Sequence, residues 1–293
     1  MSVAEGPVAG AGALEERLRA HRATGRKLLI PYVMAGTSDD WTDVVQAVAA
    51  AGADAVEVGI PFSDPMIDGP VIQRAATVAL ARATTPASVL SALSKLDAGV
   101  PLIVMTYYNI IFHAGLERAA GMLADAGVAG AILPDVPLDE VGPWADAADT
   151  AGIATVLLAA PTTGDDRMRA ICARARGFVY GVGLMGVTGE RQDLAASAGV
   201  IARRLKAITE VPVLVGIGVS TPAQAVQVAG VADGAVVGSA LVRRLLAGGG
   251  PDGAAAFVAE LRGALDAPGS PAAVSGGRTG GDAAGPPRRS GGG

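Results

Sequence analysis

Short apolar runs rich in β-branched residues recur along the chain, separated by more polar segments. There are eight of them, at 28–36, 55–61, 101–108, 130–137, 154–161, 177–184, 212–219 and 234–242. None shows the alternation of apolar and polar residues that is typical of a half-exposed strand. We therefore expect each run to form a strand buried on both faces, like the parallel strands of a sheet covered by helices.

The segments between these runs have the Ala-, Leu- and Arg-rich character of helices, for example 41–52, 114–127 and 194–209. A weak repeat joins the two kinds of segment. AAGADAVEVG, DAGVAGAILPD and AGVADGAVVG each end a helix on glycine and begin the next strand. Eight alternating units over about 250 residues predict an α/β fold of the (β/α)8 TIM-barrel type, which they match better than an open doubly wound sheet.

The predicted barrel covers residues 15–266. Residues 1–14 are expected to be a flexible segment, and the Gly/Pro/Ser-rich residues 267–293 a disordered tail without an assigned function.

Composition narrows the class of protein. The chain is 51% hydrophobic, with a net charge of −5, which gives no basic surface for nucleic acid or an anionic membrane. The uncharged run 98–116 contains a proline and several polar residues, so we expect no membrane span, and we expect no signal peptide at the N-terminus. A single cysteine, Cys172, excludes an intrachain disulfide and is consistent with the cytoplasm.

Acidic residues stand at and after the second run, VEVGIPFSDPMIDGP. In a TIM barrel the active site lies at the C-terminal ends of the strands, so Glu57 and Asp68 are candidates for acid and base. The alternatives are a structural, hydrogen-bonded acid for Glu57 and a turn aspartate for Asp68. For Asp64 a turn residue is the favoured interpretation.

Glycines mark the ends of the seventh and eighth runs, at Gly216, Gly218 and Gly238, and Ser239 stands where a helix is expected to begin. Backbone amides at such positions can bind phosphate, as TIM barrels commonly do there. The alternative is that these glycines only form tight turns. The connection after the sixth run contains Thr188 and Gly189, and is either a lid that closes over ligand or an ordinary loop.

Several reaction types are disfavoured by what the sequence lacks at the expected mouth. Lys27 precedes the first strand, and Lys95 and Lys206 fall in helical segments, so none is placed to form a Schiff base. Two histidines and one cysteine provide no His/Cys metal cluster. Metal-free acid/base chemistry on a phosphorylated small molecule is the remaining interpretation.

These motifs together resemble the tryptophan synthase alpha chain family over residues 15–265. The matching segments are IPYVMAG, VEVGIPFSDPMIDGPVIQRA, MTYYN, LPDVP, FVYGVGLMGVTG, VLVGIGVSTPAQ and VVGSALV, in that order. The resemblance implies a lyase that cleaves indole-3-glycerol phosphate to indole and glyceraldehyde 3-phosphate, a retro-aldol reaction without a cofactor in this chain.

The resemblance also implies roles for individual residues. Glu57 matches the proton-shuttling glutamate and Asp68 the aspartate that holds the indole N–H. The substrate-binding positions implied in the same way are Tyr32, Tyr107 and Tyr180 near the indole, Thr188 in the lid, and Gly189, Gly218, Gly238 and Ser239 around the phosphate.

The expected partner is a tryptophan synthase beta chain, which carries pyridoxal phosphate (PLP) and joins indole to L-serine in an α2β2 assembly. Two alternatives stay open: a free-standing indole-releasing lyase without this partner, and a non-catalytic subunit that binds the ligand only to activate a partner.

Overall fold

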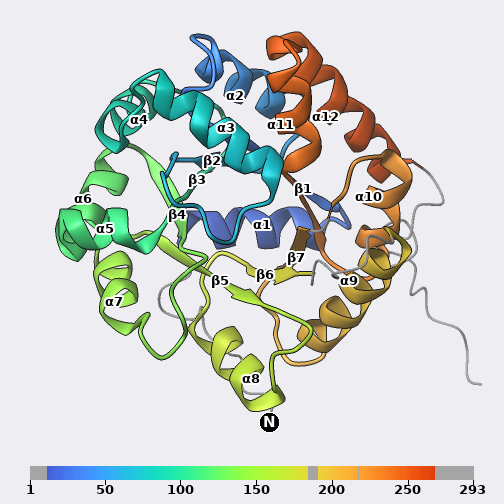
Figure 1. Ribbon diagram of the computed structural model, residues 1–293. Coiled ribbons are helices and arrows are strands. Elements are labelled where there is room, and N and C mark those ends of the chain that lie inside the picture. The colour runs from blue at the N-terminus through green and yellow to red at the C-terminus, as the bar shows by residue number, and fades with distance from the viewer. Residues whose placement is uncertain (1–11, 184–190, 217, 268–293) are drawn as a thin grey trace, which may run out of the picture.

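The computed structural model describes residues 12–183, 191–216 and 218–267 (Figure 1). Its eight strands are parallel and close into a barrel in chain order, as predicted. They are β1 Leu28–Met34, β2 Val56–Gly59, β3 Leu102–Met105, β4 Val128–Ile132, β5 Ala154–Ala159, β6 Val179–Val182, β7 Val213–Gly216 and β8 Gly234–Val237. The predicted TIM barrel is therefore confirmed.

Helices surround this barrel, except for α1, which crosses its N-terminal end (Figure 1). They are α1 Ala13–Ala23, α2 Trp41–Ala50, α3 Pro70–Ala81, α4 Pro86–Leu93, α5 Tyr108–Ala114, α6 Leu116–Asp125, α7 Gly142–Thr150, α8 Asp165–Arg174, α9 Arg191–Lys206, α10 Pro222–Ala229, α11 Ser239–Leu246 and α12 Gly250–Asp266. Proline occupies the first position of α3, α4 and α10, where its missing N–H removes no helical hydrogen bond.

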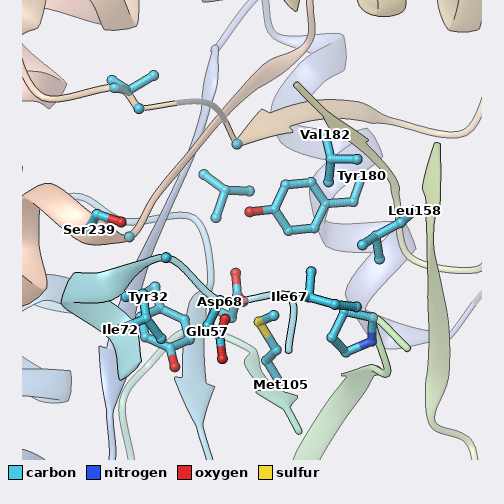
Figure 2. A pocket seen from close by; sticks show the side chains of 17 residues that line it. Tyr32, Glu57, Ile67, Asp68, Ile72, Met105, Leu158, Tyr180, Val182 and Ser239 are labelled. Atoms are coloured by element: carbon cyan, nitrogen blue, oxygen red, sulfur yellow. The ribbon is translucent and has the colours of Figure 1, made fainter. Parts of the chain in front are cut away.

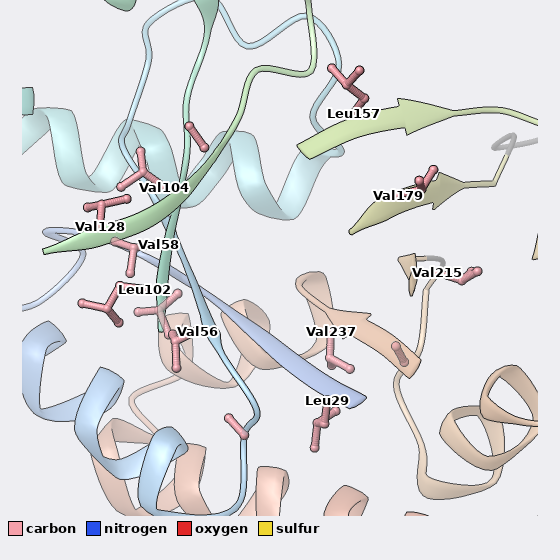
Figure 3. Packing of buried hydrophobic residues seen from close by; sticks show 14 of the residues in the cluster. Leu29, Val56, Val58, Leu102, Val104, Val128, Leu157, Val179, Val215 and Val237 are labelled. Carbon is pink, nitrogen blue, oxygen red and sulfur yellow. The ribbon is translucent and has the colours of Figure 1, made fainter. Parts of the chain in front are cut away.

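Successive side chains of each strand point alternately into the barrel and out to the helices. Leu28 and Ile30 of β1 face inward, where Leu14 and Leu18 of α1 close the N-terminal end of the barrel. The outward set packs under the helices (Figure 3), and includes Leu29, Val56, Val58, Leu102, Val104, Val128, Leu157, Val179, Val215 and Val237. Both sets are apolar, which explains why the sequence shows continuous apolar runs rather than alternation.

The strands are shorter than the apolar runs that predicted them. The run 234–242, for example, contains all of β8 and also the first turn of α11, which begins at Ser239. The apolar residues that follow the last residue of a strand belong to the next loop and helix. Lys95, expected in a helix, lies in the turn that follows α4.

The described chain gives two boundaries near the predicted ones: α1 begins at Ala13 and α12 ends at Asp266. Most of the predicted terminal segments, 1–14 and 267–293, lies outside the described residues.

Candidate active site

The two candidate carboxylates enter the barrel mouth from neighbouring parts of the chain. Glu57 lies in the middle of β2, between the outward-facing Val56 and Val58, so its side chain points into the barrel and is only 1% exposed. Asp68 follows in the loop between β2 and α3, and both residues line one cavity (Figure 2). Asp64, by contrast, is exposed and accepts a hydrogen bond from Ser63 Oγ at 2.5 Å.

The cavity has a volume of about 200 Å³ and two chemically different ends. In Figure 2, Ser239 lies on the opposite side of the cavity from Leu158 and Val182, with Glu57 and Asp68 between them. The apolar side is formed by Ile67, Met105, Pro134, Leu158 and Val182, and the opposite side by Gly216, Gly218, Gly238 and Ser239. An apolar ring and an anionic group could thus be held at the two ends, on either side of the carboxylates.

Burial sets the protonation of the two carboxylates. Burial, together with the smaller effect of the negative charge of Asp68, raises the pKa of Glu57 to about 8. Burial also raises the pKa of Asp68, but the hydroxyl of Tyr107 donates to Asp68 Oδ2 at 3.1 Å and opposes that rise. Asp68 therefore ionises first, and Glu57 keeps its proton near neutral pH.

Glu57 also has an oxygen without a hydrogen-bond partner. Among the described residues, no donor or acceptor contacts its buried Oε2. A buried polar atom in this condition is unusual in a folded protein and destabilises it unless a ligand supplies the partner. A carboxyl group that exchanges a proton near neutral pH and lines a cavity is suited to general acid/base catalysis.

Two of the three predicted tyrosines line this cavity. Tyr32 and Tyr180 are buried, and burial raises the pKa of each hydroxyl well above its ordinary value. Glycine leaves room for both rings: a Cβ on Gly59 would lie 1.9 Å from the Tyr32 hydroxyl, and one on Gly216 would lie 2.1 Å from the Tyr180 hydroxyl.

The third tyrosine, Tyr107, does not line the cavity. Its hydroxyl donates a hydrogen bond to the Asp68 carboxylate. Its ring stacks on Phe62, with ring centroids 5.0 Å apart.

The glycine-rich end of the cavity has the backbone of an anion site. Helix α11 begins at Ser239 with Gly238 as its N-cap, and no side chain caps its first turn. Gly218 adopts a φ of +51°, which residues other than glycine rarely adopt. The exposed N–H groups and dipole at a helix N-terminus favour anions. Thr188 and Gly189, predicted for the lid and the phosphate, lie outside the described residues.

Sequence reasoning missed the apolar wall. Ile67, Met105, Pro134, Leu158 and Val182 lie at strand ends or in the loops after them, but as residue types they are no different from core residues. Their position at the C-terminal ends of the strands was the available signal.

Two further observations concern the described ranges alone. No three His, Cys, Asp or Glu side chains gather there in a way that could hold a metal ion. None of the helices is both long enough and apolar enough to cross a membrane.

The fold and the cavity define the class of protein: a TIM-barrel enzyme with two carboxylates at the C-terminal mouth, between an apolar wall and a glycine-rich helix N-terminus. The sequence model of the tryptophan synthase alpha chain matches residues 18–262. The chain belongs to the tryptophan synthase alpha chain family and is a lyase of tryptophan biosynthesis.

Individual relatives agree. The chain is 47% identical to the tryptophan synthase alpha chain of Streptomyces coelicolor over 246 residues, which cover 83% of this chain and 90% of the relative. It is 45% identical to that of Thermobifida fusca, over 80% of this chain and 88% of the relative. A solved structure of Mycobacterium tuberculosis tryptophan synthase superposes with a TM-score of 0.81 at 37% identity, covering 88% of this chain and 100% of the compared chain.

Proposed function

We propose that Glu57 and Asp68 carry out the cleavage of indole-3-glycerol phosphate to indole and glyceraldehyde 3-phosphate in this chain. The observation that carries the proposal is the unpartnered Oε2 of Glu57, buried in a cavity that Asp68 also lines. Glu57, with its pKa near 8, donates its proton to indole C3 and then accepts the proton of the glycerol hydroxyl. The C–C bond breaks as that hydroxyl oxygen becomes the aldehyde, so the carboxyl group ends the cycle protonated again.

Asp68 has a different task in this scheme. Protonation of C3 leaves positive charge on the indole nitrogen, and an ionised carboxylate that accepts the N–H hydrogen bond stabilises that charge. The hydrogen bond from Tyr107 favours the ionised form of Asp68, which supports this role.

The two ends of the cavity fit the two ends of this substrate. We assign the indole to the apolar wall, with Tyr180 beside it and Tyr32 facing it across the cavity, and the phosphate to Gly218, Gly238 and Ser239 at the start of α11. Ser239→Asp places a carboxylate among these groups and is expected to weaken binding of a phosphate ligand about tenfold or more by charge repulsion. Isothermal titration with glycerol phosphate measures this, and unchanged affinity would refute the assignment.

Indole made in this cavity would pass to a tryptophan synthase beta chain, which carries PLP and joins indole to L-serine, and we propose an α2β2 assembly with it. Exposed apolar side chains on the side of the barrel that holds the cavity support a docking surface: Met66 is 91% exposed, Ile67 53% and Phe112 64%.

The remaining assignments complete the proposal. We assign the catalytic unit to residues 15–266 and propose that this chain itself uses no cofactor. The free thiol of Cys172 supports a cytoplasmic location.

The test is indole release from indole-3-glycerol phosphate by the purified chain, with and without a tryptophan synthase beta chain. We expect slow release that the beta chain accelerates. Fast release that is indifferent to the beta chain would favour a free-standing lyase. Ligand binding without release in either case would indicate a non-catalytic subunit.

A further inference from the structure

The segment 65–68, which ends in Asp68, has an unusual set of attachments. Met66 is exposed, Ile67 is 53% exposed at the edge of the cavity that it lines, and the Asp68 side chain also lines the cavity. Within the described chain, no backbone amide or carbonyl of 61–68 hydrogen-bonds to another backbone group. Backbone pairing therefore does not hold Asp68 in place, and the fixing contacts must come from side chains.

Tyr107 supplies two of these contacts. It is the N-cap residue of α5 and is 5% exposed, with its ring stacked on Phe62. Its hydroxyl accepts a hydrogen bond from the Ile67 amide at 3.2 Å and donates one to Asp68 Oδ2 at 3.1 Å. One buried hydroxyl thus fixes both the backbone before Asp68 and the orientation of its carboxylate.

Gln73 supplies the other two contacts. It lies at the start of α3, where its backbone amide donates to Gly69 O at 3.0 Å. Its side-chain amide donates to Asp68 O at 2.8 Å and to Pro65 O at 3.3 Å. Gln73 therefore ties the first and last carbonyls of the segment to one helix.

We propose that Tyr107 and Gln73 are positioning residues that hold the segment 65–68 so that the Asp68 carboxylate faces the substrate. Neither residue lines the cavity, so each acts through Asp68 and not on the substrate. The inference rests on the proposed function, because it takes Asp68 as the group that stabilises the reacting indole.

The charge around Asp68 gives Tyr107 a second effect. The titratable groups that face Asp68 are Glu57 on β2, Tyr32 on β1, Tyr180 on β6 and Tyr107 itself. Among these groups, in the part of the chain that the structure describes, Tyr107 is the one that donates a hydrogen bond to the Asp68 carboxylate. This hydrogen bond favours the ionised form of Asp68. Removing this hydroxyl should raise the pKa of Asp68.

Tyr107→Phe is the first test, because it keeps the ring and its stacking on Phe62 and removes only the hydroxyl. We expect kcat for cleavage of indole-3-glycerol phosphate to fall about 10- to 100-fold with KM little changed, because a misplaced group costs the reaction more than binding. The acidic limb of the kcat–pH profile should move to higher pH. Tyr108→Phe is the matched control, since no described residue hydrogen-bonds to that hydroxyl, and its kinetics should match the wild type.

Gln73→Glu is the second test. It keeps the shape of the side chain but turns an acceptor toward the two carbonyls that Gln73 now holds, and we expect kcat to fall while KM stays near the wild-type value. Gln73→His, which can keep one N–H donor, should recover part of the lost rate. If thermal stability falls together with kcat, and KM is affected as much as kcat, the role of Gln73 is merely structural and the proposal is overturned.

A measurement that does not depend on turnover separates the positioning role of Tyr107 from the proposed function of the chain. The carboxyl of Asp68 can be followed by 13C NMR across pH, with its signal assigned from Asp68→Asn. A pKa that rises in Tyr107→Phe supports the positioning role even if the chain does not cleave the substrate, in which case only the proposed function fails. Unchanged kcat and unchanged Asp68 pKa in Tyr107→Phe, in an active wild type, would overturn the positioning role and leave the proposed function standing.

Discussion

Two buried carboxylates lie three positions apart on the same stretch of chain and differ in almost every other respect. Asp54 precedes β2 and is 0% exposed, and Glu57 lies within β2 and is 1% exposed. The first belongs to the N-terminal floor of the barrel and the second to its C-terminal mouth.

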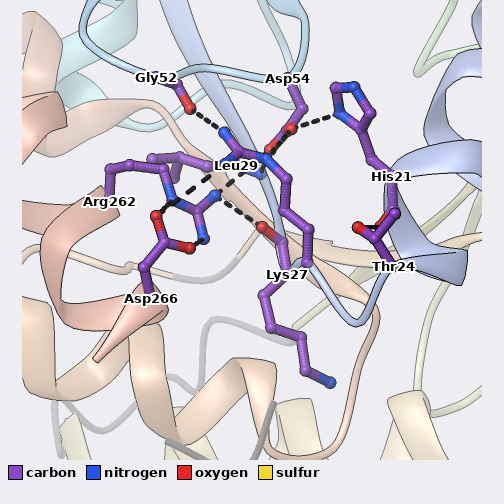
Figure 4. A network of polar contacts seen from close by, with 9 residues as sticks. His21, Thr24, Lys27, Leu29, Gly52, Asp54, Arg262 and Asp266 are labelled. Atoms are coloured by element: carbon purple, nitrogen blue, oxygen red, sulfur yellow. Dashed lines mark hydrogen bonds and ion pairs between the residues drawn. The ribbon is translucent and has the colours of Figure 1, made fainter. Parts of the chain in front are cut away.

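Both carboxylate oxygens of Asp54 have hydrogen-bond or ion-pair partners (Figure 4). Its Oδ2 accepts from the Leu29 amide at 2.8 Å, and its Oδ1 contacts His21 Nδ1 at 2.7 Å and Arg26 Nε at 2.6 Å. Arg262 of α12 approaches Oδ2 at 3.4 Å and also donates to Lys27 O at 2.7 Å. These contacts join α1, β1 and α12, which lie far apart in the sequence.

Glu57 has no such set of partners for Oε2, and its burial is therefore not offset. The comparison teaches that a buried carboxylate surrounded by cations and amides stabilises the fold, whereas one left unpartnered in a cavity is available for chemistry. In TIM barrels these two tasks are divided between the bottom and top faces.

The largest effect is expected from Glu57→Gln. An amide of the same shape cannot transfer the proton, so kcat for indole release should fall about 10³-fold or more, within the upper range of general acid/base contributions. Binding of glycerol phosphate should be unchanged, because the glycine-rich end is untouched. Steady-state kinetics and isothermal titration measure the two effects, and near-normal turnover would contradict the division of tasks.

Asp54→Asn should show the opposite pattern. Removing the carboxylate takes away the buried counter-charge of Arg262 and Arg26. Arg262 keeps its ion pair with the partly exposed Asp266, so the free energy of unfolding should fall by about 3 kcal/mol, the lower end of the cost of breaking a buried ion pair. The kcat of the molecules that remain folded should match the wild type. Urea unfolding and activity corrected for the folded fraction provide the test. A loss below about 1 kcal/mol would mean that the contacts around Asp54, at the N-terminal end of the barrel, do not stabilise the fold.

The pH dependence of stability should report on the buried carboxyl group of Glu57. The pKa of Glu57 is raised from 4.5 to about 8 in the folded state, so between these values the folded protein holds one proton more than the unfolded chain. Stability from this group therefore falls as pH rises through this range, by a few kcal/mol at most, since one pKa unit corresponds to about 1.4 kcal/mol. Urea unfolding at pH 5 and pH 8 should show a steeper loss for the wild type than for Glu57→Gln, and equal slopes would argue against the raised pKa.

The sequence made the fold predictable because each strand and helix is encoded locally. Continuous apolar runs mark strands buried on both faces, and glycine marks helix ends: Gly52 and Gly127, after α2 and α6, both adopt positive φ. Gly230, in the equivalent place after α10, has a φ of −64°, so the shared pattern did not require the same backbone.

The site was predictable only in part. Glu57 attracts notice because a carboxylate within an apolar run is out of place, whereas Asp54 stands just before that run and attracts none, although it is buried as deeply. Their difference depends on Arg26, Arg262 and His21, which only the closed barrel brings to one of them. Likewise the attachment of Asp68 by Tyr107 depends on the neighbouring strand, and local sequence carries no sign of it.

The smallest predicted effect comes from His21→Ala, which removes one partner of Asp54 and leaves three. His21 is partly exposed, so its hydrogen bond competes with water, and we expect a loss of about 1 kcal/mol in the free energy of unfolding with kcat unchanged. Combining it with Asp54→Asn tests whether the contact itself matters, because the double variant should then be no less stable than Asp54→Asn alone. If His21→Ala lowers the free energy of unfolding by the same amount in the Asp54→Asn background, His21 stabilises α1 by other contacts. His21 would then not be one of the partners that distinguish Asp54 from Glu57.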